Sequence, residues 1–99
     1  MDKCKITILK KTLNRDFVEK YAVSEVVPCE YFQEGQEIIV DSPFELPEGF
    51  CSWAWSDIRH DVFSVMLGGK RPYANPPEAA IACCTDGYRP VFFKIETFK

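Results

Sequence analysis

The sequence CSWAWSDIRHDVFSVML, residues 51–67, decides the fold of this 99-residue chain. Its apolar positions recur at steps of four, three, four and four residues, which is the spacing of one face of an α-helix. These positions are Cys51, Trp55, Ile58, Val62 and Met66. Gly68 and Gly69 follow and predict the end of the helix. The segment is therefore expected to be a long amphipathic helix, with Trp55 buried and Trp53 more exposed.

Segments on both sides of this helix predict β-strands. Cys4, Ile6 and Ile8 alternate with polar residues, which is typical of a half-buried strand and places Cys4 in the core. Residues 37–40, 79–84 and 89–98 are rich in β-branched and aromatic residues. The last two of these segments flank a turn, which predicts a β-hairpin. The expected strands cover residues 3–9, 37–40, 79–84 and 89–98.

A second, short helix is expected between Asn14, which can cap it, and Tyr21. Phe17, Val18 and Tyr21 form its apolar side. The order strand, helix, strand, helix, strand, strand predicts an α+β fold. We expect a small, mostly antiparallel sheet with one long helix packed on a face and one short helix, in a single domain over residues 1–99.

Composition excludes several classes of protein. Fifteen acidic and twelve scattered basic residues give a net charge of -3, which argues against a nucleic-acid partner. The N-terminus does not resemble a signal peptide, and no apolar run reaches the roughly 20 residues of a membrane span. An odd number of cysteines without an export signal predicts free thiols and a cytoplasmic location. One sheet face stays uncovered by the helix, so we expect a homo-oligomer, most simply a dimer.

The five cysteines are the residues best suited to unusual chemistry, and none of them belongs to a CxxC pair. Cys51 falls at the start of the long helix, where the positive end of the helix dipole stabilises a thiolate. It is therefore either a reactive thiol or a small apolar residue that begins the buried stripe. Zn²⁺ or an iron–sulfur cluster would need four soft ligands, for which Cys29, Cys51, Cys84 and His60 are the candidates. Because these come from separate elements, we expect no metal site.

The Cys83–Cys84 pair precedes the hairpin turn, and neighbouring strand residues point to opposite faces. A short loop would place Cys84 opposite Arg89 and Ala82 opposite Val91. Cys84 then lies on the face toward the helix, and Cys83 lies on the other face. Packing the helix on this hairpin should bring Cys51 and Cys84 toward the same end of the core. The strand face toward the helix holds Ala80, Ala82, Cys84, Val91, Phe93 and Ile95.

His60 is the single histidine of the chain, with Asp57 three residues before it and Asp61 beside it. A carboxylate neighbour can orient an imidazole as a general base or metal ligand. The alternative is a solvated helix face that includes Trp53, Asp57 and His60. Residues 68–71, Gly-Gly-Lys-Arg, superficially resemble a phosphate cradle, but they follow a helix, where the dipole has the wrong sign for an anion.

Three blocks together resemble a family of short, uncharacterised bacterial and archaeal proteins of about 90 residues. The blocks are Cys29-Glu30 with Gly35, Phe50-Cys51-Ser52-Trp53-Ala54-Trp55 with Asp57, and Cys83-Cys84-Thr85-Asp86-Gly87 with Arg89-Pro90-Val91. The resemblance covers nearly the whole chain. It implies a stand-alone domain of prokaryotic cytoplasm, and it implies no activity, cofactor or catalytic residue.

Two classes of function remain open from the sequence. The first is a non-enzymatic ligand-binding or assembly module, which the large number of aromatic residues favours. The second is a cysteine-dependent protein of sulfur, redox or metal handling that uses Cys51 with Cys84. The sequence lacks a Ser-His-Asp order, a nucleotide-binding loop and paired catalytic carboxylates. It therefore names no reaction or cofactor, and we favour the binding module.

Overall fold

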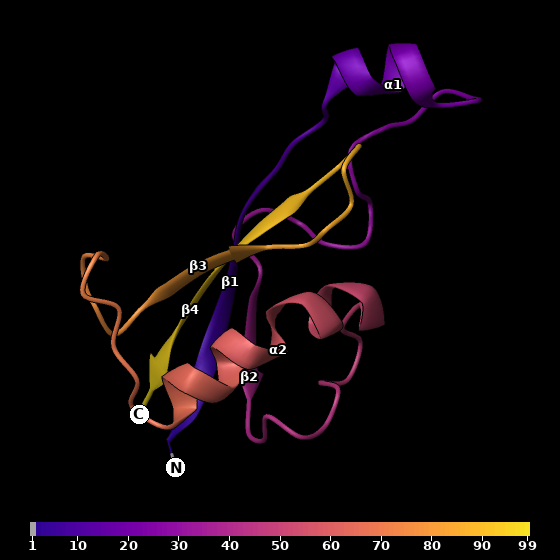
Figure 1. Cartoon of the computed structure of the whole chain (residues 1–99). Coiled ribbons are helices and arrows are strands. Elements are labelled where there is room, and N and C mark those ends of the chain that lie inside the picture. Colours follow the sequence, from indigo (N-terminus) through magenta and orange to yellow (C-terminus); the bar gives the residue numbers. More distant parts are fainter. Residues whose placement is uncertain (1) are drawn as a thin grey trace.

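The computed structural model describes residues 2–99 and shows a four-stranded sheet with two helices (Figure 1). The sheet order is β2-β1-β4-β3, and each neighbouring pair is antiparallel. This is the small α+β fold that the sequence predicts. The elements are β1 (Lys3–Lys11), α1 (Arg15–Tyr21), β2 (Glu37–Val40), α2 (Ser52–Met66), β3 (Ala80–Cys83) and β4 (Val91–Phe98).

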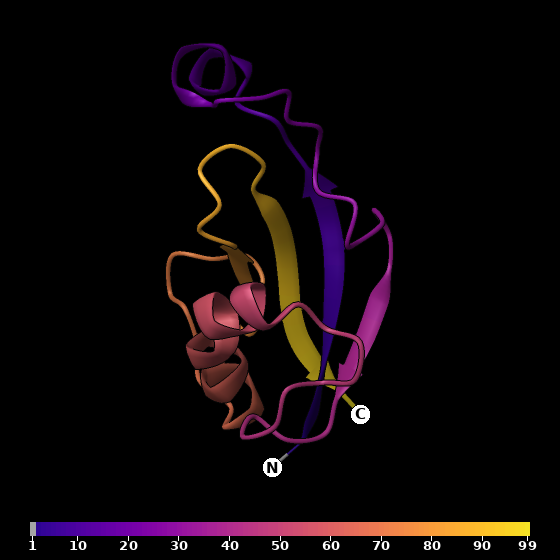
Figure 2. The same cartoon turned by 90° about the vertical axis from the view of Figure 1, so that its right-hand side faces the viewer.

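The long helix α2 covers one face of the sheet (Figure 2), and the core lies between them. Its predicted register is confirmed, since Trp55 is 7% exposed and Trp53 is 64% exposed. Full burial of a large apolar side chain stabilises a fold by about 1.5–3 kcal/mol. The buried residues of α2 are Ala54, Trp55, Ile58, Val62, Val65 and Met66.

The predicted end of α2 at the two glycines is confirmed. Gly68 has a φ of 83°, a conformation that costs other residues about 1–2 kcal/mol. Its N–H donates to the Val65 carbonyl at 3.0 Å, and the Gly69 N–H donates to the Ser64 carbonyl at 2.8 Å. This pair of bonds satisfies the last helix carbonyls. Both glycine N–H groups are occupied, so the glycines do not form an anion cradle.

The first strand is confirmed on the predicted face, since Cys4, Ile6 and Ile8 are all buried. The strand continues to Lys11, two residues beyond the predicted end. A bulge at Leu9 explains the difference, because the register with β4 shifts between Ile8 and Lys10. The bulge interrupts the alternation that marks a strand in the sequence and lets pairing continue beyond it.

The predicted hairpin register is wrong by two residues. Ala82 pairs with Phe93 instead of Val91, and Cys84 lies opposite Val91 instead of Arg89. The connection spans residues 85–90 because Asp86 stabilises a turn of its own and Pro90 has no N–H for the ladder. A shift of two residues keeps each side chain on its predicted face, so Cys84 is buried and Cys83 is exposed.

The short helix α1 has the predicted bounds, but Asn14 does not cap it through its side chain. The Asn14 amide donates instead to the carbonyl of Gly87 in the hairpin loop, at 2.7 Å. None of the residues of α1 is buried. Figures 1 and 2 show α1 beyond one end of the sheet, away from α2. Within residues 2–99, neither helix is long and apolar enough to span a lipid bilayer.

The sheet face opposite α2 carries ion pairs. Lys5 lies 3.4 Å from Glu37 on β2 and 4.0 Å from Glu96 on β4, and Lys94 lies 3.6 Å from Glu96. One face of an antiparallel sheet commonly remains in contact with water. This face of the sheet is therefore in contact with solvent. Exposed apolar side chains such as Ile81 lie beside its ion pairs.

Candidate functional site

A cleft of about 560 Å³ lies at the start of α2. Three segments far apart in the sequence line it: residues 29–32 before β2, the first turn of α2, and the hairpin loop between β3 and β4. Its volume falls within the range of about 300–1,000 Å³ that is typical of small-molecule sites. The cleft is therefore a candidate for a small-molecule site.

Three of the five cysteines line this cleft. Cys51 is the residue at the N-terminal cap of α2, Cys84 directly follows β3, and Cys29 belongs to the segment before β2. The structure therefore brings Cys51 and Cys84 to the same end of the core, as the sequence analysis predicts. Cys29 lies in the same cleft, in a segment whose sequence has neither the strand nor the helix period. All five cysteines are free.

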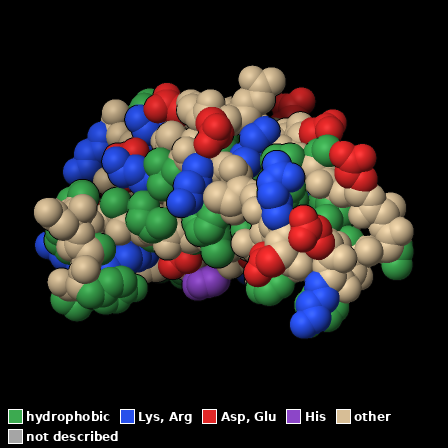
Figure 3. Space-filling model, turned by 90° about the horizontal axis from the view of Figure 1, so that it is seen from above, with side chains coloured by type: hydrophobic (Ala, Val, Ile, Leu, Met, Phe, Trp, Pro, Cys, Tyr) green, Lys and Arg blue, Asp and Glu red, His purple; other side chains and the backbone are tan. Residues whose placement is uncertain are grey.

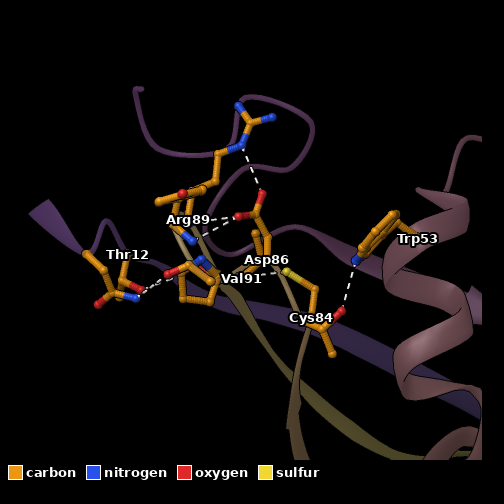
Figure 4. Close-up of polar contacts among 11 residues, drawn as sticks. Thr12, Trp53, Cys84, Asp86, Arg89 and Val91 are labelled. Atoms are coloured by element: carbon orange, nitrogen blue, oxygen red, sulfur yellow. Dashed lines mark hydrogen bonds and ion pairs between the residues drawn. The ribbon is translucent and has the colours of Figure 1, made fainter. Parts of the chain in front are cut away.

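Cys84 has a defined hydrogen-bond environment. Its Sγ accepts the N–H of Val91 at 3.3 Å, and its own N–H donates to the Val91 carbonyl at 3.1 Å (Figure 4). A regular antiparallel pair would direct the Val91 N–H to a carbonyl. Here the sulfur takes that place, which fixes the Cys84 side chain at the wall of the cleft.

Cys51 occupies the end of α2 with the unpaired N–H groups. Its carbonyl accepts the first helix bond, from Trp55 N at 2.9 Å, and its side chain makes no capping hydrogen bond. The first turn of α2 contains no acidic residue. The positive end of the helix dipole is therefore not neutralised by a carboxylate within this turn.

A hydrogen-bonded clamp fixes the hairpin loop to α2. The Asp57 carboxylate accepts the Thr85 N–H at 2.8 Å and the Thr85 hydroxyl at about 3.0 Å. Trp53 Nε1 donates to the same hydroxyl oxygen at 3.0 Å (Figure 4). Trp53 and Asp57 are one helical turn apart, so a single residue of the loop can bind both. The clamp holds two walls of the cleft at a fixed separation.

The rest of the hairpin loop is organised by Asp86. Its Oδ1 accepts the N–H groups of Tyr88 at 3.0 Å and Arg89 at 3.2 Å, and its Oδ2 pairs with Arg89 Nε at 3.1 Å. The expectation that Asp86 is a turn residue agrees with these contacts. An aspartate that accepts N–H groups two and three residues ahead sets the path of a turn.

Aromatic side chains form the inner wall of the cleft. Phe32, which lines it, is buried and packs against Phe50 with ring centroids 5.0 Å apart and against Phe93 at 5.5 Å. Phe50 in turn contacts Trp55 at 5.9 Å. The Phe32–Phe93 and Phe50–Trp55 pairs have the edge-to-face geometry that aromatic rings prefer. The inner wall is therefore apolar and backed by packed aromatic rings.

His60 does not line the cleft. Its side chain is exposed, and Nε2 lies 3.5 Å from the Asp61 carboxylate. Asp57 contacts Thr85 instead of His60. These positions correspond to the solvated helix face that the sequence analysis gave as the alternative. His60 is thus separated from both Cys51 and Cys84.

The cysteines outside the cleft have contrasting surroundings. Cys83 is exposed on the outer side of β3, whereas Cys4 is fully buried in the sheet. Burial raises the pKa of the Cys4 thiol from 9.0 to about 12, because the core cannot solvate a thiolate. Within residues 2–99, no three His, Cys, Asp or Glu side chains lie close enough together to hold a metal ion. The candidates Cys29, Cys51 and Cys84 share the cleft without forming such a group.

Several residues of the site could not be predicted from the sequence. Phe32 and Tyr31 lie in an irregular segment, and Thr85 was expected only as part of a turn. The four-residue spacing of Trp53 and Asp57 is a signal that one partner could contact both side chains. Nothing in the sequence identifies Thr85 as that partner, because 28 residues separate it from Asp57.

No protein-family model, curated protein or solved structure matches this chain. The resemblance to short prokaryotic proteins therefore stays a prediction from the three sequence blocks.

Proposed function

We propose that this chain is a non-enzymatic binding module whose ligand is a small, largely apolar molecule. The observation that carries the proposal is the cleft of about 560 Å³ between α2 and the hairpin loop. Its inner wall is aromatic, while Thr85, Asp86 and Arg89 supply polar groups at the loop side. An apolar site with a few fixed polar groups is the usual composition of a ligand pocket.

The rigidity of the walls supports binding of this kind. The clamp of Trp53, Thr85 and Asp57 fixes the loop before any ligand arrives. A preformed site loses less conformational entropy on binding than a loop that must become ordered. The polar groups of the clamp are already satisfied by one another, so the ligand need not supply their hydrogen bonds.

The neutral, apolar dye Nile red provides a direct test of the cleft. Its fluorescence should increase on saturable binding to the folded protein. Cys29→Phe places a large side chain in the cleft and should abolish this binding. Cys83→Phe makes the same substitution at an exposed cysteine outside the cleft and should retain it.

Both variants must show cooperative urea denaturation, which confirms that they are folded. Equal Nile red affinity in the two variants would contradict the proposal, because it would place the dye outside the cleft. Absence of saturable binding to the parent protein would contradict it as well.

Thiol chemistry at Cys51 and Cys84 is the second candidate function. The observation that favours it is that both side chains line one cleft, with Cys51 at a helix N-terminus that lacks acidic residues. The thiolate is the form of cysteine that acts as a nucleophile, a sulfur carrier or a metal ligand. The buried Cys4 provides an internal reference.

Two measurements distinguish this candidate from the binding module. Iodoacetamide labelling of the native protein near neutral pH, read by peptide mass spectrometry, should modify Cys51 faster than Cys4. Intact mass and elemental analysis of protein purified without oxygen should then reveal persulfide sulfur or bound metal. Labelling of Cys51 as slow as that of Cys4, with neither sulfur nor metal bound, would exclude thiol chemistry.

A homodimer in a prokaryotic cytoplasm completes the proposal. Free cysteines fit a reducing compartment. The exposed Ile39 on the edge strand β2 supplies apolar surface for a second copy, beside the ion pairs of the outer face. Light scattering coupled to size exclusion should give twice the monomer mass at micromolar concentration. A monomeric mass throughout this range would exclude the dimer.

A small-molecule ligand is proposed in preference to nucleic acid because of the charge distribution. Figure 3 shows Lys and Arg side chains interspersed with Asp and Glu over the face seen from above. Several of the cations are paired, including Lys3 with Asp41 and Arg89 with Asp86. A phosphate backbone is bound by a continuous basic surface, which this arrangement does not favour.

A further inference from the structure

Arg71 is a buried cation without an anionic partner. It lies in the connection that follows α2 and is 8% exposed. Within residues 2–99, no carboxylate lies within ion-pair distance of its guanidinium. Arginine remains charged at any ordinary pH, and burial of an unpaired charge destabilises a protein. Its burial therefore requires an explanation.

The guanidinium is only partly satisfied by the protein. Its Nη1 donates to the Gly69 carbonyl at 3.4 Å, which is a long hydrogen bond. In the part of the chain that the structure describes, no fully buried side-chain nitrogen lacks a partner. The other guanidinium nitrogens of Arg71 therefore reach accessible surface. Arg71 lines a cavity of about 390 Å³, which provides that surface.

This cavity is separate from the cysteine cleft. It is formed by the connection between α2 and β3, together with two residues from β3 and one each from α2 and β4, and the two sites share no lining residue. The backbone N–H of Arg71 donates to the Pro77 carbonyl at 2.8 Å, and its carbonyl accepts the Ala74 N–H at 3.0 Å. These bonds fold the connection around the guanidinium.

Among the described lining residues, Arg71 is the cation that has no carboxylate within ion-pair distance. Arg71 and Lys94 are cationic, and Asp61 is the one carboxylate among the described lining residues. Asp61 lies 3.5 Å from His60, and the Lys94 ammonium lies 3.6 Å from Glu96 outside the cavity. The rest of the wall is largely apolar and includes Ala79, Ala80 and Ile81.

We propose that this cavity binds a small organic monocarboxylate, with its carboxylate on the Arg71 guanidinium and its apolar part against Ala80 and Ile81. The planar guanidinium matches a carboxylate through two parallel hydrogen bonds. A single negative charge balances the charge of the Arg71 guanidinium, whereas a phosphate dianion would exceed it. The Gly69 carbonyl and the negative end of α2 also oppose a second negative charge.

Isothermal titration with three benzene derivatives tests the charge and shape of this site. Benzoate is the monocarboxylate, benzamide is its neutral analogue, and phenyl phosphate is the dianion. Benzoate should bind saturably with a Kd at least about ten-fold below those of the other two. Absence of benzoate binding, or binding of benzamide with equal affinity, would overturn the proposal.

Arg71→Met tests the role of the guanidinium, with the exposed Arg15→Met as the matched control. The Arg71 variant should lose benzoate binding, retain Nile red binding in the cleft, and unfold at the same temperature as the ligand-free parent or higher. Arg15→Met should bind benzoate normally. Benzoate binding retained by Arg71→Met would overturn the proposal, as would a large fall in its unfolding temperature, which would indicate a purely structural role.

A measurement on the parent protein keeps the test valid if Arg71→Met does not fold. The Nε–H resonance of Arg71 in a ¹⁵N-labelled sample should shift progressively as benzoate is added. The Nε–H resonance of Arg15 should not move. An unchanged Arg71 resonance at saturating benzoate would show that the carboxylate binds elsewhere, and the proposal would fail.

Discussion

The buried thiol of Cys4 predicts a loss of stability in alkaline solution. Cys4 lies in the central strand β1, opposite Val40 on β2 and Thr97 on β4, and is 0% exposed. Desolvation raises the pKa of its thiol from 9.0 to about 12. The unfolded chain releases this proton above pH 9, whereas the folded protein retains it up to about pH 12.

The direction and the size of the effect follow from this difference. Between pH 9 and 12 the folded state binds more protons than the unfolded state, so the free energy of unfolding falls as the pH rises. The contribution of Cys4 is complete below pH 9. Each pH unit removes about 1.4 kcal/mol, which gives a total of about 4 kcal/mol across the three units.

Urea denaturation at pH 8, 9, 10 and 11 measures this effect when the parent is compared with Cys4→Val. Other groups titrate equally in both proteins, so the difference between their unfolding free energies isolates Cys4. This difference should change by about 1.4 kcal/mol per pH unit above pH 9. The exposed Cys83 gives the control Cys83→Val, which should follow the parent. Parallel profiles for the parent and Cys4→Val would refute the reasoning.

Three further changes test the core, the clamp and the end of α2, each by urea denaturation at neutral pH. Trp55→Ala should destabilise the protein by about 3–5 kcal/mol, whereas Trp53→Ala should cost less than about 1.5 kcal/mol; equal midpoints would contradict the register of α2. Thr85→Val keeps the side-chain shape but removes the hydroxyl that joins Trp53 to Asp57, so it should cost about 1–2 kcal/mol and change Trp53 fluorescence. Gly68→Ala should cost about 1–2 kcal/mol because of its positive φ, and an unchanged midpoint would contradict that conformation.

Local patterns were sufficient to predict the main elements. The buried side of α2 follows from its helical spacing, and the buried side of β1 follows from the alternation of Cys4, Ile6 and Ile8. Each pattern has a period that only one secondary structure satisfies, so both elements could be predicted without knowledge of tertiary contacts. The meeting of Cys51 and Cys84 in one cleft was predicted from the helical spacing of α2 and from the alternation of faces along the β3–β4 hairpin.

The features that were predicted wrongly, or not predicted at all, depend on contacts between distant residues. Alternation fixes which face a hairpin residue occupies, but a slip of two residues leaves every face unchanged. The actual register of β3 and β4 depends on Asp86 within the loop and on the contact of Thr85 with Asp57. The position of Cys29 in the cleft and the burial of Arg71 likewise depend on irregular segments, for which the sequence contains no period.

The central position of β1 has a consequence for the synthesis of this protein on the ribosome. β1 is made first, yet its partner β4 follows only after every residue between Lys11 and Val91 has been added. At about 5–20 residues per second, this interval lasts roughly 4–16 s. During that time Ile6 and Ile8 have no β4 strand to pair with. The sheet therefore forms only after most of the chain has emerged, and molecular chaperones have several seconds in which to bind its apolar first strand.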